Sequence, residues 1–229
     1  MHSAAPEGDV VHVWHARLAA GGPAQTLLST DERARAARLV RTDVRARFEA
    51  GRGALRRILA SYLGCAPADV PLSVGASGKP ALTPGHSLMF NASHTADHLV
   101  VAVASRPVGI DLETLDARIS AGAIAARYFS PDEAAAIDTA APSGQALAAF
   151  IGVWTRKEAV LKALGAGLTL PLRSFSVSVP PEPARIMSAD DARLAPGQWA
   201  LADLAPMTGR VGVVALAGTA VALEEKVFV

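Results

Sequence analysis

The sequence predicts an α+β fold made of two similar halves related by a pseudo-twofold axis. Ser29 begins the pattern Ser-x-x-Glu, and Ser130 begins the same pattern 101 positions later. This pattern is a capping box, which marks the start of a helix. In each half a longer stretch with helical periodicity follows. It ends at Gly64 in the first half and at Gly165 in the second, again 101 positions apart.

In the first half, a strand is expected over Val10–His15, and the Ser29 capping box begins a helix. Apolar residues at helical spacing predict a long helix over Val44–Leu63. Ser93–Thr95 is expected to be a loop between two strands. The further strands are expected over Leu72–Val74, Leu88–Asn91, Leu99–Ala104 and Val108–Leu112.

The second half repeats this order. Pro131 follows the capping serine at the first helical position, and a long helix is expected over Ala146–Leu164. A strand over Ser174–Val179 lies about 102 positions after the one at Leu72–Val74, and Val108–Leu112 lies 98 positions after Val10. We therefore expect a duplication with subdomains 1–105 and 106–229. Their shared cleft is the expected active site, because ligands favour such boundaries.

Composition narrows the class of protein. Of the 229 residues, 51% are apolar and 19% are charged, which is typical of a folded globular chain and not of a disordered one. A single cysteine, Cys65, excludes an internal disulfide and a cysteine zinc site. The N-terminal residues lack a signal peptide, and the longest apolar run, Leu99–Ala104, is too short to cross a membrane. We expect a cytoplasmic protein with no membrane partner.

Charge is unevenly distributed although the net charge is only +1. Between Asp31 and Arg57 there are nine arginines and four acidic residues. Such a local positive field suits a phosphate-rich ligand or an acidic protein. A solvated helix surface is the ordinary alternative for any one of these arginines.

Two groups of residues suggest a metal site. Asp111 and Glu113 are two apart on an expected strand, so both carboxylates face the same side. Mg²⁺ prefers such oxygen ligands together with substrate phosphates, although strand-end acids often simply face water. Trp154, Glu158 and Lys162 share one helical face. They could form an ordinary Glu–Lys pair beside a core tryptophan, or a metal-binding glutamate beside a phosphate-binding lysine, with Lys157 as a second flanking cation.

Two further segments could bind phosphate. Ser93 and His94 offer a hydroxyl and an imidazole to phosphate oxygens, although a lone loop histidine usually serves structure. In the segment 75–80, Gly78 allows close backbone approach, Lys79 supplies charge and Pro80 stiffens the turn. Neither a Walker A motif nor a G-x-G-x-x-G motif occurs, which argues against P-loop and Rossmann enzymes.

In this order and spacing, the segments resemble the phosphopantetheinyl transferase superfamily over nearly the whole chain. Its length and two halves look like the monomeric Sfp-type branch, which activates peptide and polyketide synthases. The last two of the matching segments are together highly specific. The matching segments are Gly78-Lys79-Pro80, Phe90-Asn91-Ala92-Ser93-His94-Thr95, Val108-Gly109-Ile110-Asp111-Leu112-Glu113, Phe129-Ser130-Pro131-Asp132-Glu133 and Trp154-x-x-Lys157-Glu158-x-x-x-Lys162-x-x-Gly165.

The resemblance implies transfer of 4′-phosphopantetheine from coenzyme A to a serine of an apo carrier protein, with release of adenosine 3′,5′-bisphosphate. It implies a Mg²⁺ ion held by Asp111, Glu113 and Glu158, with Glu158 as the base and Lys162 stabilising the phosphates. Carrier domains are acidic, which suits the arginine-rich segment. The implied coenzyme A contacts are Arg35, Arg56, Lys79, Pro80, Ser93, His94 and Lys162.

One position departs from the family pattern. Glu32 stands where some members have a basic residue, so Arg33 or Arg35 would take over that phosphate contact. Arg56 lies 102 positions before Glu158, and we expect an asymmetric site with acids from one half and basic residues from the other.

Two other classes were weighed. A non-catalytic relative that binds a carrier protein or a nucleotide would not need Asp111, Glu113, Glu158 and Lys162 together. A nucleic-acid-binding protein would interleave aromatics with the arginines, but Phe48 is the only aromatic residue between 33 and 57. Fatty-acid, polyketide and nonribosomal peptide carriers all remain open as partners, and we expect a monomer.

Overall fold

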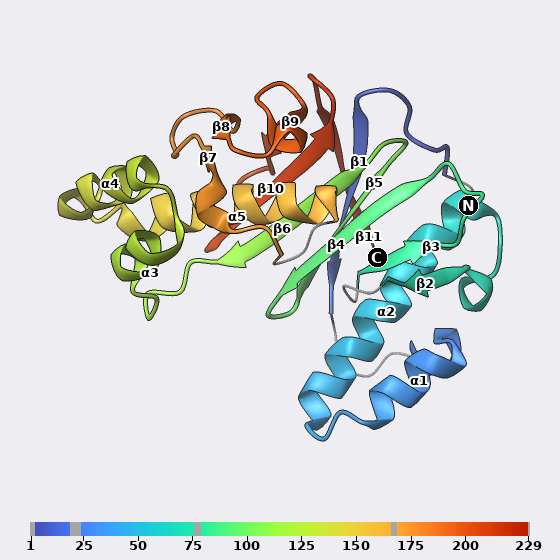
Figure 1. The fold of residues 1–229 in the computed structure, drawn as a ribbon. Coiled ribbons are helices and arrows are strands. Elements are labelled where there is room, and N and C mark those ends of the chain that lie inside the picture. The colour runs from blue at the N-terminus through green and yellow to red at the C-terminus, as the bar shows by residue number, and fades with distance from the viewer. Residues whose placement is uncertain (1–2, 19–23, 76–78, 166–168, 229) are drawn as a thin grey trace.

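A computed structural model describes residues 3–18, 24–75, 79–165 and 169–228 (Figure 1). The helices are α1 (Thr30–Ala37), α2 (Thr42–Leu63), α3 (Ala121–Tyr128), α4 (Pro131–Thr139) and α5 (Ala146–Leu164). The strands are β1 (Val10–Arg17), β2 (Leu72–Val74), β3 (Pro80–Leu82), β4 (Met89–Thr95), β5 (His98–Ala104), β6 (Val108–Thr114), β7 (Phe175–Val177), β8 (Ile186–Ala189), β9 (Trp199–Asp203), β10 (Arg210–Ala217) and β11 (Ala222–Phe228). Figure 1 shows α1 and α2 at one end of the molecule and α3 and α4 at the other.

Two main sheets form the centre, one with the order β11-β1-β5-β4 and one with the order β6-β10-β9. Alternation along β5 places residues 99, 101 and 103 in the core beneath α2, and residues 100, 102 and 104 in the core shared with the second sheet. Alternation along β10 likewise places residues 214 and 216 between the sheets and residues 213 and 215 beneath α5. The layers therefore run α2, first sheet, second sheet, α5.

Both expected helix starts and both expected helix ends are confirmed. Ser29 and Ser130 form complete capping boxes with the glutamates three residues later. The long helices α2 and α5 end at Gly64 and Gly165, whose φ angles of 67° and 73° lie in the left-handed region that favours glycine.

The loop expected at Ser93–Thr95 is wrong, because these residues belong to β4, and only Ala96 and Asp97 separate β4 from β5. Their polarity has a different cause. Phe90 and Ala92 face the core beneath α2, while the alternate residues Asn91 and Ser93 face the second sheet. Gly78 lies outside the described residues. Helix α3 and the strands after β7 were not expected from the sequence.

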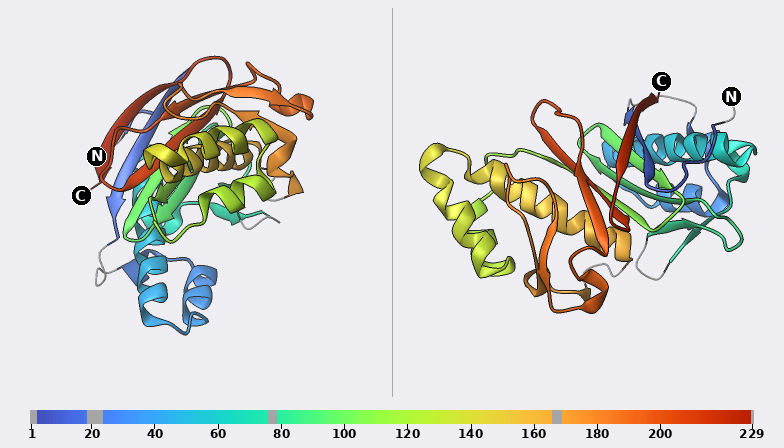
Figure 2. Two further views of the ribbon diagram at one scale, coloured as in Figure 1. Left: turned by 90° about the vertical axis from the view of Figure 1, so that its left-hand side faces the viewer. Right: turned by 90° about the horizontal axis from the view of Figure 1, so that it is seen from above.

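One sheet and one hydrophobic core each contain residues from both halves of the chain. Strand β11 pairs in parallel with β1, so the first sheet contains residues 222–228 beside residues 10–16 (Figure 2). The core between the sheets also takes residues from both sides of position 105. The expected boundary between 105 and 106 stays a prediction. Among the described residues, none of the helices combines the length and apolar character needed to span a membrane.

Candidate functional site

Alternation in β6 determines which side chains form the site. Residues 108, 110 and 112 are apolar and buried between the sheets. Gly109, Asp111 and Glu113 therefore face the other way, toward α5. A Cβ atom at Gly109 would lie 2.0 Å from the carbonyl oxygen of Ala159, so only glycine allows α5 to lie directly against this strand. This close approach brings the acids of β6 next to the face of α5 that contains Glu158 and Lys162.

Asp111 lies at the centre of the site. It is 3% exposed, and its Oδ1 atom accepts hydrogen bonds from Ser93 Oγ at 3.0 Å and from Lys162 Nζ at 2.6 Å. Its Oδ2 atom is buried and is without a hydrogen-bond partner. A buried carboxylate oxygen without a partner is costly, which favours a ligand at this position.

Glu113 and Glu158 are half-buried neighbours of Asp111. Burial, and then the charge of Asp111, raises the pKa of each carboxyl group, while the ammonium of Lys162 opposes this shift. For Glu113, the charge of Glu158 contributes as well. The three carboxylates are thus close enough to repel one another. In the described part of the chain, no three His, Cys, Asp or Glu side chains converge as a ready-made metal site.

The ammonium group of Lys162 is hydrogen-bonded to other residues of the site. Its ammonium donates to Asp111 Oδ1, to Ser93 Oγ at 3.0 Å and to the carbonyl oxygen of Ile110 at 3.3 Å. The ammonium of Lys79 in turn donates to the backbone carbonyl of Lys162. The structure therefore brings together Lys79, Ser93, Asp111 and Lys162 from β4, β6, α5 and the segment before β3.

A basic pocket of about 210 Å³ lies on the first-half side of the acids. Partial burial, and then the positive charges of Lys162 and Arg47, lowers the pKa of His94 in its wall. Arg47, Phe48 and Arg52 were not singled out from the sequence. The sequence signal that could have found these three residues is their spacing, which puts them on one side of a helix. The lining comprises Leu18, Arg47, Phe48, Gly51, Arg52, Leu55, Pro80, Ala92, His94 and Leu99.

Neither of the two predicted arginines, Arg35 and Arg56, lines this pocket. Arg35 is exposed, and its guanidinium stacks on the ring of Phe48 at 5.3 Å. Arg56 is 2% exposed and is bound by Glu32 and by the carbonyl oxygens of residues 67, 68 and 70. Burial leaves Arg56 no surface to offer to coenzyme A, so it serves structure instead. Lys157 is likewise buried, which removes it as a flanking cation of the site.

An apolar pocket of about 610 Å³ opens beside Glu113. Trp154, one turn before Glu158 on α5, forms part of its wall together with Phe150. Residues of α3, including Tyr128, line the other side. This pocket places a large apolar surface next to the acids.

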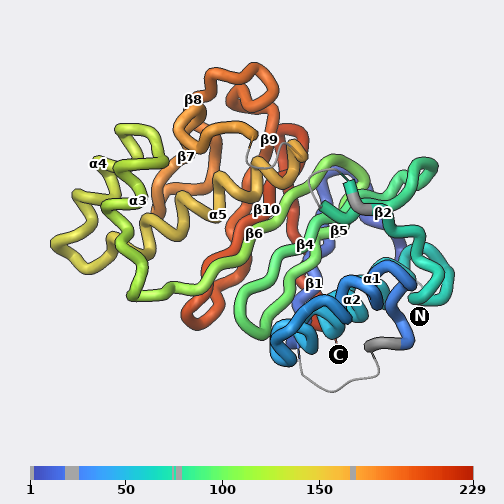
Figure 3. The backbone as a smooth tube through the Cα atoms, turned by 60° about the horizontal axis from the view of Figure 1, so that its bottom comes forward, coloured from blue at the N-terminus to red at the C-terminus, as the bar shows by residue number. Residues whose placement is uncertain are grey.

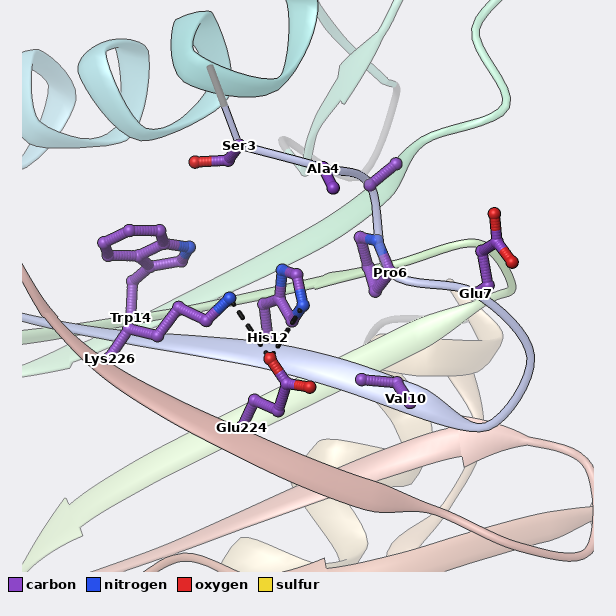
Figure 4. A pocket seen from close by; sticks show the side chains of 10 residues that line it. Ser3, Ala4, Pro6, Glu7, Val10, His12, Trp14, Glu224 and Lys226 are labelled. Carbon is purple, nitrogen blue, oxygen red and sulfur yellow. Dashed lines mark ion pairs between the residues drawn. The ribbon is translucent and has the colours of Figure 1, made fainter. Parts of the chain in front are cut away.

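A third pocket, of about 430 Å³, is formed by the N-terminal segment, β1 and β11 (Figure 4). Here Glu224 pairs with His12 at 3.1 Å and with Lys226 at 3.3 Å, and Trp14 lies beside them. None of the residues predicted for the site lines this pocket.

Comparisons with known proteins identify the family. The 4′-phosphopantetheinyl transferase superfamily matches residues 107–211. The chain is 37% identical over 221 residues to the 4′-phosphopantetheinyl transferase HetI of Nostoc sp., covering 92% of this chain and 89% of that protein. A 4′-phosphopantetheinyl transferase of Bacillus subtilis is 38% identical over 128 residues, 54% of each chain. The transferase AcpT of Salmonella typhi is 39% identical over 92 residues, 40% of this chain and 47% of that one. This chain belongs to the 4′-phosphopantetheinyl transferase superfamily.

Proposed function

We propose that the protein transfers the 4′-phosphopantetheine group of coenzyme A to a serine of an apo acyl or peptidyl carrier protein. The observation behind this proposal is the adjacency of three carboxylates to a basic pocket, with Lys162 between them. Such an arrangement suits a ligand with several phosphates and a reacting phosphorus at the boundary. Membership of the superfamily and the similarity to the 4′-phosphopantetheinyl transferase HetI support the same reaction.

Coenzyme A is proposed to place its adenosine and 3′-phosphate in the basic pocket. Arg47 and Arg52 supply positive charge there, His94 supplies a ring nitrogen for hydrogen bonding, and Pro80 and Phe48 supply apolar surface. We propose that Arg47 and Arg52 take the place of the buried Arg56 and supply the phosphate contact that Glu32 cannot make. Lys79 lies where the pyrophosphate would pass toward the acids. The apolar pocket beside Glu113 offers a surface to the pantetheine arm.

The site fits a magnesium ion held by Asp111, Glu113 and Glu158. All three donors are hard carboxylate oxygens, one of them the unpartnered Oδ2 of Asp111. Mutual repulsion of the three groups is the second supporting observation, because a cation relieves it. When bound, the ion would neutralise charge on the phosphate oxygens.

The chain's own residues would handle the proton. As the serine oxygen bonds to the β-phosphorus, the bond from that phosphorus to the bridging oxygen breaks and adenosine 3′,5′-bisphosphate leaves. Glu158 would accept the hydroxyl proton, directly or through a water molecule. The ammonium of Lys162 adds positive charge beside the reacting phosphates.

The two pairs of helices also bear on the architecture of the enzyme. The equivalent pairs α1–α2 and α4–α5 support an internal duplication with its site in the cleft between subdomains 1–105 and 106–229. A monomer in the cytoplasm, acting on fatty-acid, polyketide or nonribosomal peptide carriers, fits this assignment. The arginine-rich helix α2 would face the acidic carrier domain.

The test is incubation with coenzyme A, MgCl₂ and a panel of apo carrier domains, read by intact-mass spectrometry. We expect a phosphopantetheine mass gain on at least one carrier. Glu158→Gln should lower kcat by at least about a hundredfold with coenzyme A affinity retained, whereas Arg57→Gln, on the exposed side of α2, should retain the wild-type kcat at saturating carrier. Binding of coenzyme A and carrier without any mass gain would make the protein a non-catalytic relative.

A further inference from the structure

Strands β4 and β6 lie side by side (Figure 3) but belong to different sheets, and hydrogen bonds from side chains join them. Three polar residues at alternate positions of β4 face β6. Asn91 Oδ1 accepts from the backbone N–H of Ile110 at 2.9 Å, and the hydroxyls of Thr95 and Thr114 lie 2.9 Å apart. Between them, the Ser93 hydroxyl reaches the carboxylate of Asp111. Asn91 and Thr95 thus join the two strands, while Ser93 alone touches a proposed metal ligand.

The hydroxyl of Ser93 already makes hydrogen bonds within the protein and has no hydrogen left to donate to coenzyme A. Ser93 is 8% exposed, and its single hydroxyl hydrogen is donated to Asp111 Oδ1 at 3.0 Å. The hydroxyl oxygen of Ser93 also accepts a hydrogen bond from Lys162 Nζ at 3.0 Å. A hydroxyl that gives its hydrogen to Asp111 cannot also donate it to a phosphate oxygen. This geometry differs from the coenzyme A contact that the sequence suggested for Ser93.

The two oxygens of Asp111 have different surroundings. Oδ1 is held by Ser93 and Lys162, whereas Oδ2 is buried without a partner. Hydrogen bonds to a charged carboxylate are strong and directional, so the two donors determine how the carboxylate is rotated. Side chains that orient a metal ligand in this way commonly change metal affinity by 10–100-fold when removed.

We propose that Ser93 is a positioning residue for the metal site: with Lys162, it holds Asp111 so that Oδ2 points to the divalent cation. This proposal rests on the proposed function for the identity of the site. It also makes the metal site depend on both halves of the chain, because the ligand comes from β6 and the residue that orients it comes from β4.

The test measures metal binding by the full chain without coenzyme A, using Mn²⁺ as the probe and electron paramagnetic resonance of free Mn²⁺ as the readout. Ser93→Ala should weaken Mn²⁺ binding by about tenfold or more. Ser93→Thr, which keeps the hydroxyl, should restore most of the affinity. Thr95→Val is the matched control, because it removes a hydroxyl contact between the same two strands without touching Asp111.

Coenzyme A binding, measured by calorimetry in EDTA, should be the same for Ser93→Ala and the wild type. Thermal melting of each variant is the check that it is folded. If Ser93→Ala binds Mn²⁺ normally while coenzyme A affinity falls, the positioning role is overturned and Ser93 contacts the coenzyme. If Thr95→Val weakens Mn²⁺ binding as much as Ser93→Ala does, the role of Ser93 is to join the two strands and not to position Asp111.

The two proposals can fail separately. If the wild type modifies a carrier but Ser93→Ala binds Mn²⁺ as well as the wild type, the Ser93 assignment is overturned and the transferase stands. If no carrier gains mass yet Ser93→Ala loses Mn²⁺ affinity, the transferase proposal fails and the Ser93 assignment stands. A wild type that binds no Mn²⁺ overturns the metal site and the role of Ser93 together.

Discussion

Two ion pairs, 101 positions apart, occupy equivalent places in the two halves. In the first half, capping-box Glu32 binds Arg56 of the long helix at 2.7 Å. In the second half, capping-box Glu133 binds Lys157 at 2.9 Å. Each basic group also donates to carbonyl oxygens of the segment after its helix, residues 67, 68 and 70 in one case and residues 172 and 175 in the other.

The pairs differ in how completely they are buried. The side chain of Glu32 is 13% exposed and lies 3.4 Å from a second cation, Arg52. The side chains of Glu133 and Lys157 are 2% and 0% exposed, and burial lowers the pKa of Lys157 against the opposing charge of Glu133. The second pair is therefore the more sensitive to loss of one partner, because a buried unpaired charge is costly.

The next residue along each helix shows where the halves diverge. The alignment that pairs Arg56 with Lys157 pairs Arg57 with Glu158, so the earlier pairing of Arg56 with Glu158, at 102 positions, is wrong by one residue. Arg57 is exposed, whereas Glu158 faces the acids of β6. The ion pair is therefore present beside both long helices, whereas the proposed metal ligands lie beside only one of them.

Breaking the more buried pair should have the largest effect. Glu133→Gln leaves the ammonium of Lys157 buried without its counterion, and we expect a loss of about 3–5 kcal/mol in the free energy of unfolding, measured by urea denaturation. The double variant Glu133→Gln, Lys157→Met should recover part of this loss. A loss below about 1 kcal/mol would contradict the comparison.

The matched change in the first half should cost less. Glu32→Gln removes a carboxylate that is 13% exposed and leaves Arg56 with its three carbonyl acceptors, so we expect a loss of about 1–2 kcal/mol under the same conditions. Equal losses for Glu32→Gln and Glu133→Gln would show that burial does not distinguish the pairs.

The smallest effect concerns pH. Because the folded-state pKa of Glu158 is raised, the native chain holds its proton more tightly than the unfolded chain does. Ionisation therefore lowers stability as pH rises from about 4 through the raised pKa. In EDTA, Glu158→Gln should be more stable than the wild type at pH 8 by under about 1 kcal/mol, and equally stable near pH 4.

The control for this pH measurement is the equivalent first-half position. Arg57→Gln should show no pH-dependent difference in thermal melting from the wild type, because Arg57 is an exposed surface residue. A lower stability of Glu158→Gln at pH 8 would contradict the repulsion among the three carboxylates.

Local signals predicted the elements of the site well. Capping boxes, terminal glycines and alternation gave α1, α2, α4, α5 and β6, because each depends on neighbouring residues. The family resemblance predicted that Asp111 and Glu113 of β6 and Glu158 of α5 belong to one site. Arg56 and Lys157 look like surface charges in the sequence, since their burial depends on segments at residues 67–70 and 172–175. Ser93 was noticed, but its partner depends on how two sheets meet, which no local pattern encodes.

The parallel pairing of β11 with β1 has a consequence for how the chain is made. Ribosomal synthesis delivers residues 10–17 early, but the neighbour that covers one edge of that strand emerges more than 200 residues later. Until then β1 has an open edge, and open edges invite pairing with other chains. The sheet that contains β1 is therefore complete only after residues 222–228 have been made, and β1 keeps one open edge until then.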